Sequence, residues 1–180
     1  MRNFKVDGIV IKRNNYGEAD RLLTLFTRQF GKMKVKASGV RKITSRRSSH
    51  IELLNYASLT LFQGRKYPVL TEVATIHSFD GVKNNLRKIG YSYHLCELID
   101  GLCAENQEND RVFGLLQKTL LRLEKSEDTK TLVDEFEIEL LTILGFWNRS
   151  FVHQQLDTHQ FIENILERRL RSKRIFAKIS

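Results

Sequence analysis

The chain has 180 residues and a mass of 21.1 kDa, a length that allows one large domain or two small ones. Hydrophobic residues make up 41% and charged residues 28%, which is typical of globular proteins and too apolar for a disordered chain. No apolar run approaches about 18 residues, and the N-terminus lacks the apolar stretch of a signal peptide, so we expect neither a membrane span nor classical secretion. The two cysteines, Cys96 and Cys103, are too few for a four-cysteine zinc site, and a reduced, cytosolic protein is the simplest expectation.

The charge is unevenly distributed along the chain. Lys and Arg number 30 and Asp and Glu 21, which gives a net charge of +9 and a pI near 9.7. The net charge is +9 over residues 1–80, −4 over residues 81–160 and +4 over residues 161–180. A basic first half beside an acidic middle indicates that one part contacts a polyanion while the other holds the fold or meets a partner. A chain that is merely basic and soluble is the alternative.

The first part of the chain, from Phe4 to Phe79, is predicted to be all-β. Short segments rich in Val, Ile, Leu, Thr and Phe alternate there with turn residues, which predicts strands and hairpins. We expect five strands, at residues 6–13, 20–27, 32–38, 58–63 and 69–79. Five strands with one long connection between the third and the fourth favour a Greek-key barrel of the OB type, and an SH3-like barrel is the competing closure.

After Phe79 the hydrophobic period changes from two to about 3.6, which predicts helices. The first helix is marked by an apolar stripe over residues 86–103. Residues that favour helix starts precede the next three stripes: Asn109 and Asp110, Thr131 with Asp134, and Asp157 with Thr158. Gly145 is expected to end the third of these four helices. We therefore predict an α+β chain, with an OB-fold nucleic-acid-binding domain over residues 1–79 and an all-helical domain, a candidate partner platform, over residues 80–180.

The third predicted strand carries a basic stripe. A period of two places Lys32, Lys34 and Lys36 on one face and Met33, Val35 and Ala37 on the other. The stripe spans about 13 Å, which is enough to follow two or three phosphates of an extended nucleic-acid strand. The connection that follows, residues 38–49, has no acidic residue and contributes Arg41, Lys42, Arg46 and Arg47. A flexible cationic loop beside a cationic strand predicts contact with phosphates, and a solvated outer face is the alternative.

Other cations and rings extend this set. The last predicted hairpin contains Arg65, Lys66 and Tyr67, and Tyr16 lies in the first hairpin. Either tyrosine suits base stacking or simply covers an end of the barrel. A C-terminal run forms a candidate secondary basic patch or a solubilising helix end: Arg168, Arg169, Arg171, Lys173 and Arg174.

Motifs for catalysis and metal binding are missing from the sequence. It contains no phosphate-binding loop, nucleophile elbow or HExxH pair, so we expect neither an enzyme nor a cofactor. The spacing of His153, Asp157 and His159 fits no common metal site, and these are interpreted as surface histidines, with no metal predicted. Cys96 and Cys103 belong to an apolar helix face and are interpreted as buried thiols.

Several segments resemble the RecO family. The N-terminal ones are GIVIK at residues 8–12, YGEADRLLTLFT at 16–27 and GKMKVKASGVRK at 31–42. The helical half adds weaker similarity around Tyr93 and Glu97, and over residues 112–116 and 136–146. Many relatives insert a four-cysteine zinc module after the Leu-Gly-Phe segment, whereas here residues 146–158 form a short cysteine-free linker, so zinc is not expected.

The resemblance implies a specific function. It implies a cytoplasmic, nucleoid-associated bacterial mediator with no membrane contact, which binds single- and double-stranded DNA and anneals complementary strands. Its partners would be RecR, the single-strand-binding protein and, indirectly, RecA, which it helps to load. The acidic, Phe-terminated tail of the single-strand-binding protein would need an apolar slot with a cation, for which Arg87, Lys88 and Arg122 are candidates. The alternative is a protein–protein adaptor whose helical domain is primary and whose barrel binds nucleic acid only weakly.

Overall fold

A computed structural model describes residues 3–148 and 157–175 of the chain. The chain forms two compact units. The first combines Met1–Ser78 with Cys103–Asp110, and the second combines Phe79–Leu102 with Arg111–Ser180. Residues 103–110 follow a helix of the second unit in the sequence but pack with the strands of the first unit, to which they belong. No helix in the described ranges is both long and apolar enough to cross a membrane.

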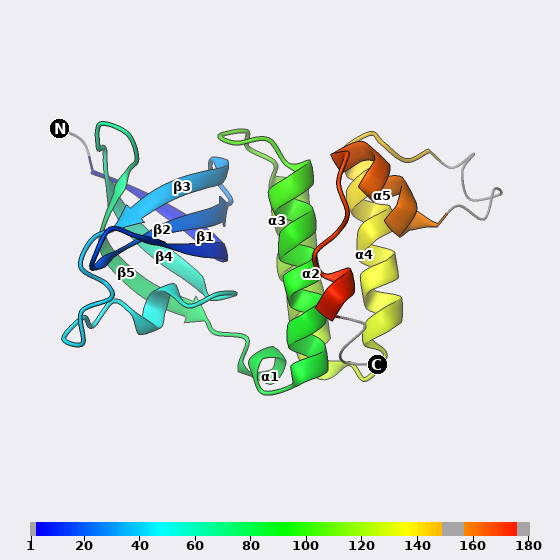
Figure 1. Cartoon of the computed structure of the whole chain (residues 1–180), viewed down its shortest axis with the longest axis horizontal. Helices are drawn as coiled ribbons and strands as arrows, with labels where there is room; N and C mark the ends of the chain where they lie inside the picture. Colours follow the sequence, from blue (N-terminus) through cyan, green and yellow to red (C-terminus); the bar gives the residue numbers. More distant parts are fainter. Residues whose placement is uncertain (1–2, 149–156, 176–180) are drawn as a thin grey trace. The chain divides into compact units, whose positions relative to one another are not determined.

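Five strands curl into a closed barrel (Figure 1). They are β1 (Asn3–Tyr16), β2 (Asp20–Thr27), β3 (Gly31–Ala37), β4 (Tyr56–Phe62) and β5 (Val69–His77). Their order is β1-β2-β3-β5-β4, with antiparallel neighbours except for a parallel β3–β5 pair at Lys36 and Val69. The predicted OB barrel is therefore confirmed. β1 runs further than predicted, because Tyr16 still pairs with Asp20 and the turn is confined to residues 17–19.

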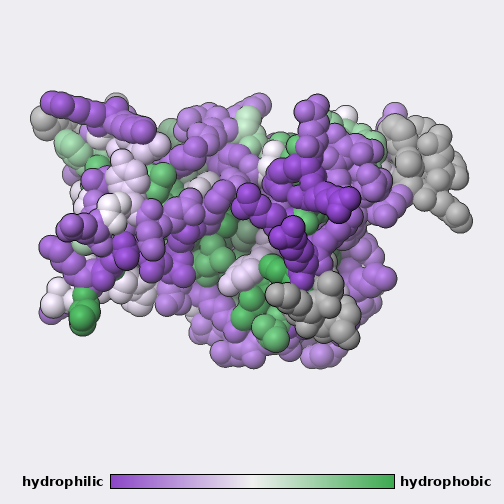
Figure 2. Space-filling view, viewed as in Figure 1, coloured by the Kyte–Doolittle hydropathy of each residue, from purple (hydrophilic) through white to green (hydrophobic). Residues whose placement is uncertain are grey.

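The barrel interior is built from the alternating apolar positions of all five strands. Its core comprises Val6, Val10, Leu23, Leu25, Met33, Val35, Ala37, Ala57, Leu59, Leu61 and Leu70, together with two side chains from the β3–β4 loop, Val40 and Ile51. Burial of such side chains contributes about 1.5–3 kcal/mol each, so the loop residues help to hold the barrel closed. Figure 2 shows that the outer surface over this loop is hydrophilic apart from one small hydrophobic spot.

The long β3–β4 loop is anchored rather than free. It contains the 3-10 helix η1 (Ser49–Ile51). The Arg47 guanidinium donates to the carbonyls of Leu70 at 2.8 Å and Ser38 at 2.9 Å. The loop was predicted to be flexible, and these contacts correct that prediction for its second half, whereas residues 41–44 are exposed.

The second unit is helical, as predicted. Its helices are α1 (Asp80–Lys83), α2 (Leu86–Leu102), α3 (Asp110–Lys125), α4 (Thr129–Ile143) and α5 (Thr158–Leu166). Asp157 caps α5 by accepting from the amides of His159 and Gln160, which confirms the predicted start. α4 begins two residues before Thr131, because the Asp128 carboxylate accepts from the Thr131 amide, so the prediction of Thr131 as the start is wrong. Gly145, with φ of 81°, follows the C-cap residue Leu144 and ends α4 as expected.

Charged groups of the helical unit make contacts inside the unit. The Glu97 carboxylate on α2 accepts from the Arg168 guanidinium at 2.7 Å and from the amides of Arg171 and Ser172 at 2.9 Å. The Lys88 ammonium, buried on α2, donates to the Glu124 carbonyl at 3.0 Å. These bonds tie the segment after α5 and the end of α3 to α2.

Candidate nucleic-acid interface

The predicted alternation along β3 is present in the structure. Met33, Val35 and Ala37 point into the barrel core. The three lysines lie on the opposite face, but their surroundings differ: Lys32 is 7% exposed, whereas the side chains of Lys34 and Lys36 are 39% and 34% exposed. The two ends of the strand therefore lie in different environments.

At the N-terminal end of β3 lies an acidic segment, Cys103–Asp110, here called the acidic strap. Lys32 and Glu105 form a parallel bridge, and the Asn106 amide donates to the Lys32 carbonyl at 2.7 Å. The Lys34 ammonium lies 2.7 Å from a Glu105 carboxylate oxygen. Two of the three predicted phosphate-binding lysines thus lie against an acidic segment of the chain itself.

The strap fits closely on the strand. Gly31 has φ of +65°, and a Cβ there would lie 1.8 Å from the Gln107 carbonyl oxygen, so no other residue fits. At the end of the strap the Asp110 carboxylate lies 3.8 Å from the Arg28 guanidinium. Sequence reasoning missed this segment, although its three acidic and no basic residues were a visible signal.

At the C-terminal end of β3, three connections meet around Lys36. The Lys36 amide donates to the Pro68 carbonyl at 2.8 Å, which brings in the β4–β5 hairpin. Its ammonium lies 3.0 Å from a carboxylate oxygen of Asp20 and 5.5 Å from the centre of the Tyr16 ring, beside the β1–β2 turn. Arg41, in the β3–β4 loop, donates to the Gly17 carbonyl at 3.2 Å.

Asp20 organises this end of the barrel. One of its carboxylate oxygens accepts from the Gly39 amide at 2.8 Å, and the other faces the Lys36 ammonium. The Gly39 amide and then Lys36 lower the pKa of Asp20, so its carboxylate is charged at neutral pH and holds the turn, the strand and the loop together. Sequence reasoning did not single out Asp20, because its role depends on contacts with Lys36 on β3 and with Gly39 in the β3–β4 loop.

The exposed and partly exposed cations and rings near this end form a set that we call the cationic rim. Tyr16 is 38% exposed with Lys36 above its ring, a geometry in which a base can stack on the ring while the cation meets a phosphate. On the β4–β5 hairpin the Lys66 ammonium lies 5.3 Å from the centre of the Tyr67 ring in the same way. The rim comprises Tyr16, Lys36, Arg41, Lys42, Arg46, Arg65, Lys66 and Tyr67. Arg47 is left out because its guanidinium anchors the loop.

The C-terminal basic run has a different character. Arg168 pairs with Glu97, and the Lys173 ammonium lies 3.0 Å from a Glu163 carboxylate oxygen. Arg169, Arg171 and Arg174 are exposed. Because two of the five cations are paired with acids, the run contributes to the packing of the segment after α5, and it is the weaker candidate for a DNA surface.

The structure also places most of the histidines and cysteines that were interpreted from the sequence. Asp157 is a helix cap, and His153 lies outside the described residues. His159 is only partly a surface residue, because its side chain is 25% exposed and lies 3.0 Å from a buried carboxylate oxygen of Glu137. Cys96 and Cys103 are buried, as predicted, and burial raises the pKa of their thiols to about 12 and about 11, so both are protonated and unreactive at neutral pH.

The fold and the rim define a class: an OB-fold protein with an added helical unit, whose barrel carries cations and aromatic rings on its loops. The family described as Recombination protein O N terminal matches residues 1–79, and Recombination protein O C terminal matches residues 83–147. The chain belongs to the RecO family.

Curated relatives carry the name DNA repair protein RecO. The one from Roseiflexus sp. is 36% identical over 145 residues, which cover 81% of this chain and 51% of the relative. The relatives from Symbiobacterium thermophilum and Dehalococcoides mccartyi are both 35% identical, over 81% and 80% of this chain and 58% and 57% of their own length. The chain thus spans between half and three fifths of the length of these relatives.

Proposed function

We propose that this chain binds single- and double-stranded DNA through the cationic rim and acts in DNA repair as a non-catalytic recombination mediator. The observation that carries the proposal is the meeting of three connections at the C-terminal end of β3, where Lys36 lies above the exposed Tyr16 ring and Arg41 is fixed to the neighbouring turn. Cations at fixed spacing attract phosphates, and an exposed ring under a cation offers a stacking platform for an unpaired base.

In the proposed mechanism the rim binds one strand by its backbone. Contacts to phosphates carry no sequence information, so the bases are left available to pair with a complementary strand, which is what annealing requires. We propose that the protein anneals complementary strands and, together with RecR, helps to load RecA onto DNA covered by the single-strand-binding protein, as the family resemblance implies. Lys32 and Lys34 contribute less than predicted from sequence, because the acidic strap lies against them.

The test is fluorescence anisotropy of a labelled oligonucleotide and of its duplex at about 50 and about 200 mM salt. Each phosphate contact contributes about −0.7 to the slope of log K against log salt for single strands, so the six rim cations predict a slope of roughly −4. Binding that is independent of salt, or no binding to either DNA, would contradict the proposal. Annealing is measured separately, from the quenching of dye-labelled complementary strands on mixing.

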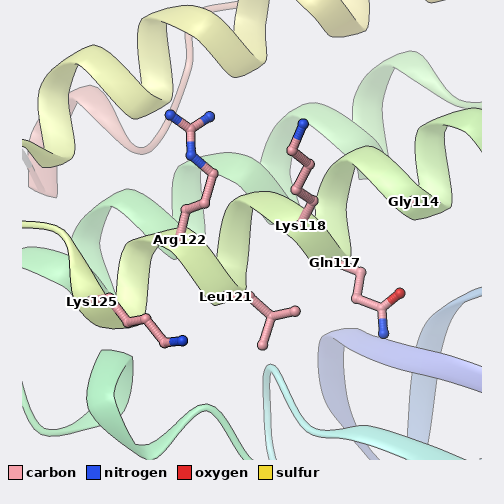
Figure 3. Close-up of a pocket in the computed structure, with 6 residues that line it drawn as sticks. All are labelled: Gly114, Gln117, Lys118, Leu121, Arg122 and Lys125. Carbon is pink, nitrogen blue, oxygen red and sulfur yellow. The ribbon is translucent and has the colours of Figure 1, made fainter.

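A second candidate function makes the helical unit the primary site, as an adaptor for an acidic peptide that ends in Phe. A shallow groove on α3 favours it, lined by Gly114, Gln117, Lys118, Leu121, Arg122 and Lys125 (Figure 3). Lys118 and Arg122 extend from one side of the helix and Gln117 and Leu121 from the other. Leu121 is 40% exposed and offers apolar surface beside the cations.

The groove bears on which of the cations named from the sequence can bind an acidic peptide. Lys88 is buried with its ammonium on the Glu124 carbonyl, so it is unsuited to a peptide, whereas Arg122 lines the groove and is balanced by Glu135 at 2.9 Å. Titration of a labelled acidic, Phe-terminated peptide against the full chain tests this candidate, with Leu121→Ser and Lys118→Glu as variants and Lys130→Glu on α4 as the matched control. Both groove variants should weaken binding several-fold. Equal affinity in all four proteins would reject the groove.

A further inference from the structure

Three side chains from three helices converge inside the helical unit. They are His94 on α2, Glu137 on α4 and His159 in the first turn of α5. The Nε2 atoms of His94 and His159 lie 2.6 Å and 3.0 Å from the same Glu137 oxygen, Oε1. The two rings are stacked with their centres 5.2 Å apart and an angle of 12° between their planes. Two nitrogens and one oxygen, each able to bind a metal, thus lie within 4.8 Å of one another.

The cluster is buried on one side and accessible on the other. The side chains of His94 and Glu137 are 0% exposed, and that of His159 is 25% exposed. A buried carboxylate is costly unless it is paired, and here the two imidazoles lie within hydrogen-bonding distance of one Glu137 oxygen. The site therefore combines a buried carboxylate with two imidazoles and one partly open side.

Outer contacts fix the orientation of two of the three side chains. His94 Nδ1 lies 2.7 Å from the Ser172 hydroxyl oxygen, and the Thr158 hydroxyl donates to the second oxygen of Glu137. A metal ion on Nε2 would require the His94 proton to lie on Nδ1, where the Ser172 hydroxyl can accept it. Metal-binding histidines in proteins are oriented by such a bond on the other ring nitrogen.

We propose that the helical unit binds one divalent transition-metal ion, best matched by Zn²⁺, through His94 Nε2, His159 Nε2 and a carboxylate oxygen of Glu137. Two imidazoles and one carboxylate are a known ligand set for zinc, with a water molecule in the fourth position of a tetrahedron. That water would lie on the side where His159 is exposed. Ligand atoms about 2.0–2.1 Å from a tetrahedral ion are roughly 3.3 Å apart, so Glu137 Oε1 needs to withdraw by about 0.7 Å from His94 Nε2 and by about 0.3 Å from His159 Nε2.

The surrounding charges favour a cation. Asp134, half-buried one turn before Glu137, and Asp157, just before α5, are negative charges that interact with His159. The positive charge of Lys173 opposes them. An ion held here would join α2, α4 and α5. This inference departs from the expectation of a metal-free chain drawn from the cysteine count and histidine spacing, because the ligands are far apart in the sequence and none is a cysteine.

The test uses the full chain, freed of metal by a chelator and dialysed. Zn²⁺ alone is titrated by calorimetry, and Co²⁺ alone is added while the visible absorption of a tetrahedral complex is recorded. We expect one equivalent of either ion, a higher melting temperature with Zn²⁺ and an intense visible Co²⁺ spectrum. Loss of one ligand in His159→Gln should weaken Zn²⁺ binding by at least about 100-fold and remove the spectrum. The matched control, His77→Gln on β5, should behave like the unmodified protein.

Two outcomes would overturn the proposal. The first is the lack of stoichiometric binding by the unmodified chain, which would identify the cluster as a hydrogen-bonded network only. The second is unchanged binding in a folded His159→Gln variant, which would put the ion elsewhere. Because His159 is partly exposed at a helix start, this variant is expected to fold, and its circular dichroism spectrum checks that. Glu137→Gln, which keeps the shape of the side chain, is a second variant in which binding should be lost.

Discussion

The barrel and the helical unit use charge in opposite ways. In the barrel, Arg41, Lys42 and Arg46 are exposed on a loop that has no acidic neighbour in the sequence. In the helical unit two carboxylates have internal partners: Glu97 binds the segment after α5, and Glu137 lies between two histidines. Exposed charges contribute little to stability but attract a polyanion, whereas paired buried charges are costly to disrupt. Charge changes on the exposed barrel loop should therefore alter binding, and those at Glu97 and Glu137 should alter stability.

The largest effect is expected at Glu97. Burial alone would raise its pKa, but hydrogen bonds from Arg168 and from the amides of Arg171 and Ser172 lower it from 4.5 to about 2. Because the folded-state pKa is depressed, the stabilisation is fully present above pH 4.5 and is lost as the pH falls towards 2. A shift of this size corresponds to at most roughly 3 kcal/mol, and less where the exposed Arg168 is screened.

Glu97→Gln should remove this pH dependence. The variant should be less stable than the unmodified chain at pH 7, and the difference should shrink as the pH is lowered through the window below 4.5. Urea unfolding followed by circular dichroism at several pH values measures it. The exposed Glu127→Gln serves as the control. A constant difference at every pH would show that the variant acts through packing alone.

The next effect concerns the rim. Simultaneous replacement of Lys36, Arg41 and Lys42 by Ala should remove three phosphate contacts and flatten the salt slope by about 2, which corresponds to roughly 100-fold weaker single-strand binding near 0.1 M salt. Lys34→Ala, at the strap-covered end of the same strand, should weaken binding far less. An equal loss of single-strand affinity in the two variants would show that the two ends of β3 do not differ in their contact with DNA.

How far the sequence predicts this molecule depends on the separation of the interacting residues. The lysine alternation on β3, the barrel and the Asp157 cap follow from local patterns, and the structure confirms each of them. Two other features join residues that are far apart in the chain. The acidic strap pairs Glu105 with Lys32, and His94 lies 43 positions before its partner Glu137. Hydrophobic periodicity does not reveal such pairs. It therefore predicts a solvent-exposed Lys32, whereas in the structure the acidic strap lies against this residue and leaves it 7% exposed.

A smaller effect is expected from Tyr16. If a base stacks on its exposed ring, Tyr16→Ala should weaken single-strand binding about tenfold, since stacking contributes about 1–3 kcal/mol per base. Tyr16→Phe keeps the ring and should bind like the unmodified chain. The salt slope should stay the same in both variants, because no phosphate contact is lost. A changed slope in Tyr16→Ala would mean that the ring positions Lys36 instead of stacking.

The smallest effect, and the only gain, is expected from the strap. The Glu105 carboxylate lies 2.7 Å from the Lys34 ammonium and competes with phosphates for it. Glu105→Gln keeps the backbone bonds between the strap and Lys32 but removes the competing charge. One additional phosphate contact steepens the salt slope by about 0.7 and strengthens binding at most about fivefold near 0.1 M salt. Glu108→Gln, on the same strap, is the matched control. If Glu105→Gln binds no better, and Lys34→Ala has no effect in that background, then Lys34 serves only to fasten the strap, and the DNA surface of the barrel ends at Lys36.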